Sequence, residues 1–185
     1  EIDEDPRKVY DALDLQEVIH VIASKSPRMD VFMLDENISK SYSWIIVLDA
    51  SKSMNCVKDF ALELFSVLAQ VANELLIDPT SWAMYAFNDR LLVVKDPKER
   101  YNMRVKSRIG GIEFEGFTCM QDALQVAGQM IKSRAENLRL ITIISDGWPY
   151  GHTNPKVTLA DTIDALEKKN ISVVGIGARS RKMES

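Results

Sequence analysis

Cysteine, histidine and long apolar runs are scarce in this chain of 185 residues. Its two cysteines are too few for a disulfide framework, which favours a reducing compartment. Its two histidines, His20 and His152, give no general basis for a Ser-His-Asp triad. No apolar stretch approaches the roughly 20 residues of a membrane-spanning helix, and the amino end has no signal-peptide pattern. We therefore expect a cytoplasmic protein with no membrane partner.

Charge of one sign is not in large excess either. The chain has 23 basic and 27 acidic residues, and its net charge is -4. This mild acidity gives no general electrostatic case for nucleic acid as a partner. An apolar share of 46% beside 27% charged residues is typical of one soluble globular domain with a sizeable core.

The most informative stretch joins an apolar run to a polar cluster. Residues 44–48 (Trp-Ile-Ile-Val-Leu) are apolar at every position, which predicts a strand buried on both faces of a mainly parallel sheet. Asp49, Ser51 and Ser53 follow directly, where open α/β sheets place their ligand sites. Carboxylate and hydroxyl oxygens suit Mg²⁺, Ca²⁺ or Mn²⁺. The alternative is that Asp49 makes turn hydrogen bonds and Ser53 caps the next helix.

Helical and strand patterns alternate along the rest of the chain. We expect helices over 14–24, 57–76, 120–131 and 155–169, and strands over 44–48, 82–87, 91–94, 140–144 and 171–176. Residues 31–34 fit either a short strand or an extended connection. Asn88-Asp89 predicts a turn between two strands, and hence one antiparallel edge strand. The order predicts an α/β fold with a doubly wound, mostly parallel sheet and helices on both faces.

Two later segments carry further oxygen donors. Thr118 follows a glycine-flanked loop at the start of a predicted helix, and Gln121 three residues later fits a capping box as an alternative role. Asp146 ends the strand at 140–144, as Asp49 ends the first one. The carboxyl ends of two strands thus each present a carboxylate.

Other conspicuous residues have two interpretations each. Residues 95–108 contain six Lys or Arg, which a solvated helical face explains, with a docking patch for an acidic partner as the alternative. Cys56 and Cys119 lie near the polar cluster in sequence, either as a redox pair or in packing roles. Trp148 would suit a binding rim if exposed, or the core if buried.

The pattern D-x-S-x-S at Asp49, with Thr118 and the S-D-G at Asp146, resembles a von Willebrand factor type A (VWA) domain with its metal-ion-dependent adhesion site. The resemblance extends over about residues 42–177 and implies a Rossmann-like VWA fold. It implies that Ser51, Ser53 and Thr118 coordinate Mg²⁺ or Mn²⁺, with Asp49 and Asp146 acting mostly through waters. It also implies an interaction domain and not an enzyme, whose protein partner supplies an Asp or Glu to the cation.

The lead-in Leu13-Asp14-Leu15 resembles the intracellular type found in nitric-oxide-reductase accessory and cobalt-chelatase-like proteins. That type implies a MoxR-type AAA+ ATPase as partner in assembling other enzymes or inserting metal into them. We expect a tail and lead-in helix over 1–40, the VWA domain over 41–178 and a carboxy-terminal stub over 179–185. Because the family adds a last strand and helix after Ile176, we interpret the chain as a fragment or an unusually short variant.

Two other classes of function compete with an intracellular adaptor. An extracellular adhesion module is one, since many VWA domains are of that kind. A phosphatase of the haloacid dehalogenase type is the other, because it also begins at an Asp at a strand end. That phosphatase pattern requires a second Asp where Ser51 stands, and no glycine-rich phosphate loop is present.

Overall fold

The computed structural model describes residues 42–132, 138–147 and 158–178. The chain divides into two compact units, 1–39 and 40–185, and all described residues belong to the second unit. The predictions for 14–24 and 31–34, and the interpretations of Trp148 and of Leu13-Asp14-Leu15, lie outside the described residues. Within the described ranges, no helix combines the length and apolar character that crossing a membrane requires.

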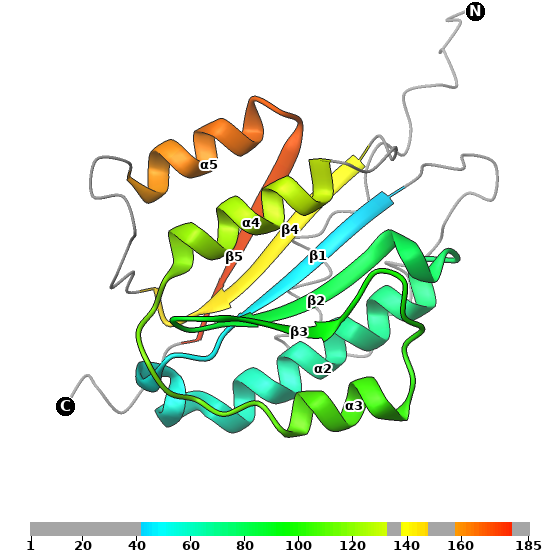
Figure 1. Ribbon diagram of the computed structural model, residues 1–185, viewed down its shortest axis with the longest axis vertical. Coiled ribbons are helices and arrows are strands. Elements are labelled where there is room, and N and C mark those ends of the chain that lie inside the picture. Colours follow the sequence, from blue (N-terminus) through cyan, green and yellow to red (C-terminus); the bar gives the residue numbers. More distant parts are fainter. Residues whose placement is uncertain (1–41, 133–137, 148–157, 179–185) are drawn as a thin grey trace, which may run out of the picture. The chain divides into compact units, whose positions relative to one another are not determined.

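A single sheet forms the centre of the described unit (Figure 1). Its strands are β1 (Tyr42–Asp49), β2 (Trp82–Phe87), β3 (Leu91–Lys95), β4 (Leu138–Ser145) and β5 (Ile171–Gly177), and they lie in the order β3-β2-β1-β4-β5. β3 pairs antiparallel with β2, whereas the other neighbours are parallel. The predicted mostly parallel sheet with one antiparallel edge strand is therefore confirmed.

β1 is the central strand and is covered on both faces. Seven of its eight residues are buried, which is the reason for its unbroken apolar sequence. Its register with β4 places Leu48 beside Ile144, so the two strands end side by side. The buried indole of Trp44 donates a hydrogen bond of 2.9 Å to the Thr142 hydroxyl of β4, which satisfies its one polar group.

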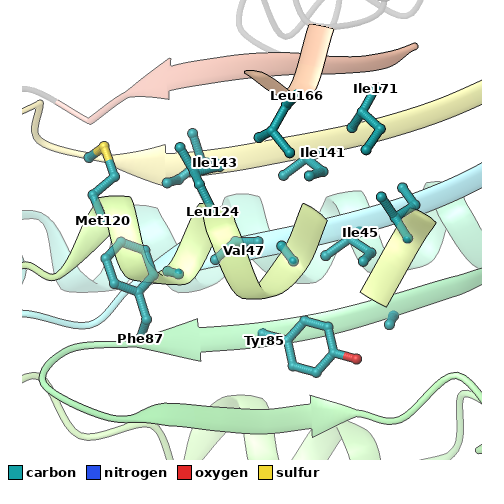
Figure 2. Packing of buried hydrophobic residues seen from close by; sticks show 14 residues of the cluster. Ile45, Val47, Tyr85, Phe87, Met120, Leu124, Ile141, Ile143, Leu166 and Ile171 are labelled. Atoms are coloured by element: carbon teal, nitrogen blue, oxygen red, sulfur yellow. The ribbon is translucent and has the colours of Figure 1, made fainter. Parts of the chain in front are cut away.

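Helices cover the two faces of the sheet (Figure 1). The helix α2 (Lys58–Leu75) packs on β1 and on α3 (Met103–Gly110). On the opposite face, α4 (Met120–Lys132) and α5 (Leu159–Glu167) pack on each other and on the strands β1, β4 and β5. Figure 2 shows the core beneath α4, where Leu124 faces Val47 and Ile143 of the sheet. The strands thus supply alternate residues to each of two apolar layers.

Several helix boundaries differ from the sequence prediction. The chain after Ser51 first forms a 3-10 turn, η3 (Lys52–Val57), and the α-helix begins only at Lys58. α5 begins at Leu159 instead of residue 155, because Thr158 and Asp161 form a reciprocal capping box there. Phe60 matched the apolar stripe of α2, yet it is 55% exposed. It lies in the first turn of α2, next to η3.

Lys95 is the clearest exception to the predicted solvated basic stretch. Its side chain is fully buried, and its ammonium donates hydrogen bonds of 2.8 Å to the carbonyls of Pro79 and Trp82. The ammonium also lies 4.2 Å from the centroid of the Trp82 ring. A buried charge needs such partners, and this lysine consequently joins β3 to the 3-10 turn η4 (Pro79–Ser81).

Candidate functional site

The order of the strands reverses at β1. From β1 the chain proceeds to β2 and β3 on one side of the sheet, then crosses through α4 to β4 and β5 on the other side. Open α/β sheets bind ligands where the strand order reverses in this way. Asp49 is the last residue of β1, and Asp146 directly follows β4. The topology therefore brings these two carboxylates to the same edge.

The Asp49 side chain is fully buried and held by two neighbours. One carboxylate oxygen accepts a hydrogen bond of 2.9 Å from the Ser51 amide, and the other accepts one of 2.7 Å from the Ser145 hydroxyl. Burial raises the pKa of Asp49 above its ordinary value of 3.8; the Ser145 and Ser51 hydrogen bonds oppose this rise, and the charge of Asp146 adds to it. A cation beside Asp49 would offset this cost of burial.

Ser51 and Ser53 present their hydroxyls to each other. Their Oγ atoms share a hydrogen bond of 3.0 Å, and the structure shows no side-chain capping bond from Ser51 to η3. Two oxygen ligands at right angles, each 2.0–2.1 Å from one Mg²⁺, would lie about 2.9 Å apart. The spacing of the two hydroxyls therefore fits a shared hard cation. Of the alternative roles, the turn hydrogen bond of Asp49 is present, whereas the helix α2 that Ser53 was expected to cap begins beyond it, at Lys58.

Backbone hydrogen bonds bring the loop that carries Thr118 against the Asp49 motif. The Glu115 amide donates to the Ala50 carbonyl at 2.9 Å, and the Lys52 amide donates to the Gly116 carbonyl at 3.2 Å. The Asn55 side-chain amide donates to the Phe114 carbonyl at 2.9 Å. Segments that are about 60 residues apart in sequence are thus joined at the carboxyl edge of the sheet.

Thr118 is buried at the end of this loop. α4 begins two residues later, at Met120, and within the described residues no hydrogen bond joins the Thr118 hydroxyl to Gln121 or to any other group. The predicted capping box is thus not formed. The Thr118 hydroxyl therefore has lone pairs that a ligand at the site could engage.

Gly116 allows the close approach of this loop to the turn between β2 and β3. Its φ of 73° is in the left-handed region, and a Cβ at this position would collide with the carboxylate of Asp89. Asn88 shapes that turn by accepting a hydrogen bond of 2.8 Å from the Arg90 amide with its side chain. The loop that carries Thr118 thus lies against both the Asp49 motif and the turn between β2 and β3.

Ser145 is a site residue that the sequence did not identify. Its buried hydroxyl donates to Asp49 and accepts a hydrogen bond of 3.2 Å from the Gly147 amide, which fixes its direction. It lies one residue before Asp146, and a serine next to a strand-end carboxylate was the available signal. Its contact with Asp49 depends on the register of β1 with β4, which no local pattern reveals.

The donor set limits which metals the site could hold. No group of three or more His, Cys, Asp or Glu side chains that could bind a metal occurs in the described ranges 42–132, 138–147 and 158–178. A cation at this edge would thus depend on hydroxyls plus the two carboxylates, which is a donor set for Mg²⁺ or Mn²⁺ and not for thiolate-preferring metals.

A pocket of about 290 Å³ lies next to Ser53, at the junction of η3 and α2, and is lined by residues 55–60. Lys58 and the exposed Phe60 are among its lining residues. Cys56, also in its wall, is exposed and donates a hydrogen bond to the Ser53 carbonyl at 3.3 Å. Cys56 and Cys119 are both free thiols. A redox pair and packing roles stay the two alternatives for these cysteines.

Comparison with known proteins identifies a family. The family model of the von Willebrand factor type A domain matches residues 44–148, more than half of the chain. No curated protein matches the chain significantly in sequence.

Several solved structures are similar in fold. One is von Willebrand factor type A from Catenulispora acidiphila, with a TM-score of 0.56 and 20% identity over 75% of this chain and 33% of that chain. Another is manganese-loaded TRAP protein of Plasmodium vivax, with a TM-score of 0.58 and 17% identity over 79% of this chain and 61% of that chain. This chain therefore spans only part of both proteins. At these identities the likeness establishes the fold alone.

Proposed function

Because the chain belongs to the von Willebrand factor type A domain family, whose members are in general protein-interaction modules, we propose that it is a metal-dependent adaptor. In this proposal Mg²⁺ or Mn²⁺ is held at a metal-ion-dependent adhesion site formed by Asp49, Ser51, Ser53, Thr118 and Asp146. A partner protein supplies an Asp or Glu side chain to the site. The domain joins proteins and catalyses no reaction.

The observation that carries the proposal is the set of oxygen donors at one edge of the sheet. The Ser51 and Ser53 hydroxyls have the spacing of adjacent ligands, and the hydroxyl of Thr118 has no hydrogen-bond partner among the described residues. The buried Asp49 carboxylate carries a desolvation cost that a positive charge would offset. Manganese in the fold-related TRAP structure is compatible with this choice of ion.

Each residue has a distinct task in the proposed site. Ser51, Ser53 and Thr118 provide uncharged oxygens, and Asp49 orients Ser51 through its backbone amide. Asp146, which is half-exposed at the end of β4, supplies the second negative charge. A bound cation would supply an electrophilic centre for a carboxylate oxygen of the partner. With only two carboxylates in the site, the positive charge remains strong enough to attract the partner's carboxylate.

The proposal is tested with a short fluorescein-labelled peptide that contains glutamate, beside the same peptide with glutamine. Fluorescence anisotropy should show binding of the glutamate peptide in Mg²⁺ and about a tenfold or greater loss of affinity in chelator. The glutamine peptide should bind weakly in both buffers. Equal affinity of the two peptides, or equal affinity with and without chelator, would show that no metal bridge forms.

Ser145→Ala should weaken metal binding without removing any proposed ligand. The variant loses the 2.7 Å hydrogen bond that orients Asp49, and groups behind the metal ligands typically contribute about 10–100-fold in affinity. Calorimetric titration with Mn²⁺ measures the change. Ser66→Ala is a matched control, because the Ser66 hydroxyl bonds only to a carbonyl within α2. Unchanged Mn²⁺ affinity in Ser145→Ala would mean that Ser145 does not support the site.

We further propose that the domain works in the cytoplasm as the partner of a MoxR-type AAA+ ATPase. The support comes from the sequence, through the lead-in residues Leu13-Asp14-Leu15 and the two free cysteines. Co-purification with such an ATPase in the presence of ATP and Mg²⁺ tests this proposal. Binding instead to an extracellular matrix or cell-surface protein would favour the adhesion-module alternative.

A further inference from the structure

Exposed basic residues gather in and before α3, away from the proposed metal ligands. Between residues 97 and 110 the chain has five Lys or Arg and a single acidic residue, Glu99, although the net charge of the whole chain is -4. Glu99 is already occupied, because its carboxylate pairs with the Arg108 guanidinium at 2.6 Å. Lys98, Arg100, Arg104 and Lys106 are all exposed, and none of them forms an ion pair within the described residues.

The arrangement on α3 differs from that of an ordinary solvated helix. Val105 and Ile109 face the core, so helical spacing places Met103 on the outer face with Arg104 and Lys106 on either side of it. Met103 is 74% exposed. Arg104 lies in the first turn of α3, where no acidic residue balances it and where a cation is unfavourable to the helix. Arg104 therefore does not serve the stability of α3.

We propose that the outer face of α3, formed by Met103, Arg104 and Lys106, docks an acidic segment of a partner protein in which Asp or Glu residues flank an apolar side chain, and that Lys98 and Arg100 in the segment before α3 add to the attraction. The four cations complement the carboxylates, and Met103 contacts the apolar residue with a flexible, polarizable side chain. Lys106 is held 5.3 Å from the centroid of the Tyr101 ring, which limits its motion before binding. The net acidity of the chain and the exposed Met103 favour a protein over nucleic acid.

This surface acts independently of the metal site. Its residues belong to α3 and the segment before it, and none of them supplies an oxygen to the proposed cation. The test uses the Asp49→Asn variant of the full chain in chelator, so that failure of the metal site cannot affect the result. The probe is a short fluorescein-labelled peptide in which glutamates flank one leucine.

The decisive comparison is between two double charge reversals. Arg104→Glu with Lys106→Glu should lower the affinity for the peptide by about tenfold or more at low ionic strength. Lys168→Glu with Lys169→Glu should leave the affinity for the peptide within about twofold of its starting value. Lys168 and Lys169 are also exposed and follow α5, so the net charge changes equally. Acidic residues at the start of α3 favour the helix, and the thermal midpoint of the first variant should not fall.

The outcomes separate specific docking from general attraction. Selective weakening by the α3 reversal, with a smaller loss in Met103→Ser, supports the proposal. Equal weakening by both reversals, no peptide binding at low salt, or tighter binding to a DNA duplex or to anionic lipid vesicles than to the peptide would overturn it.

Discussion

Asp49→Asn should abolish the stabilisation of the domain by Mg²⁺. A ligand that binds only the folded state at about 100 times its dissociation constant stabilises a protein by about 2.7 kcal/mol, and the variant should lose all of this gain. Asparagine has nearly the same shape as aspartate and still accepts the Ser51 amide hydrogen bond, but it lacks the negative charge at the proposed site. Thermal unfolding with Mg²⁺ and with chelator measures the difference.

The matched control for this substitution is Asp164→Asn, which removes an exposed carboxylate from α5. The control should keep the full Mg²⁺ effect. If Asp49→Asn retained it as well, Asp49 would not belong to a metal site.

In chelator, Asp49→Asn should raise the stability of the metal-free protein. The size of this gain should depend on pH. Burial raises the pKa of Asp49 in the folded state above 3.8, so protonation favours folding. The stability that Asp49 gives the metal-free protein is present below pH 3.8 and is lost as pH rises through the folded pKa. Asparagine does not ionise, so the Asp49→Asn variant does not lose stability in this way. The variant should therefore gain stability relative to wild type between acid and neutral pH, and urea unfolding across that range measures the change.

Lys95→Met should lower the free energy of unfolding by about 2–4 kcal/mol. Methionine can fill the space of the aliphatic part of the side chain, but the carbonyls of Pro79 and Trp82 lose their buried charged donor. The contact of the ammonium with the Trp82 ring is lost as well. The variant no longer has the desolvation cost of a buried charge, which offsets part of the loss in stability. Urea unfolding monitored by tryptophan fluorescence gives the value.

Lys98→Met is the control for Lys95→Met, because Lys98 is an exposed lysine three residues away. The free energy of unfolding of the Lys98→Met variant should remain within about 0.5 kcal/mol of that of the wild type. Equal stability of the two variants would show that the buried hydrogen bonds of Lys95 do not hold β3 to η4.

The sheet was predictable because the local sequence pattern of its strands indicates how they are buried. Residues 44–48 are apolar at every position because β1 has neighbours on both sides and helices on both faces. The hairpin of β2 and β3 followed from the Asn88-Asp89 turn, and that antiparallel pair is confirmed. In such elements a local pattern and the tertiary structure agree.

Lys95 and Phe60 were misjudged because their environments are set by distant or irregular segments. A lysine in a basic stretch gives no local sign that the carbonyls of η4 and the Trp82 ring surround it. Phe60 has helical spacing with the core residues of α2, but it lies in the turn that follows η3 and remains exposed. Local periodicity cannot report either arrangement.

The candidate site was predictable in its residue types but not in its supports. Asp49, Thr118 and Asp146 could be selected from strand ends and a helix start, and the topology accounts for the shared edge of the two carboxylates. The Ser145 hydrogen bond and the Gly116 contact depend on strand register and on loop hydrogen bonds across about 60 residues or more. Such contacts have no signature in the sequence near either partner.

Calorimetric titration of Mn²⁺ into the metal-free protein, with sodium acetate or with sodium chloride at equal ionic strength, tests the central claim most directly. Acetate has the same terminal carbon and carboxylate group as an Asp or Glu side chain. The proposed site predicts saturable binding at one site and about a tenfold or greater tightening by acetate over chloride. Absence of saturable Mn²⁺ binding in both salts, or equal affinity in acetate and chloride, would contradict a metal that bridges this domain to a carboxylate.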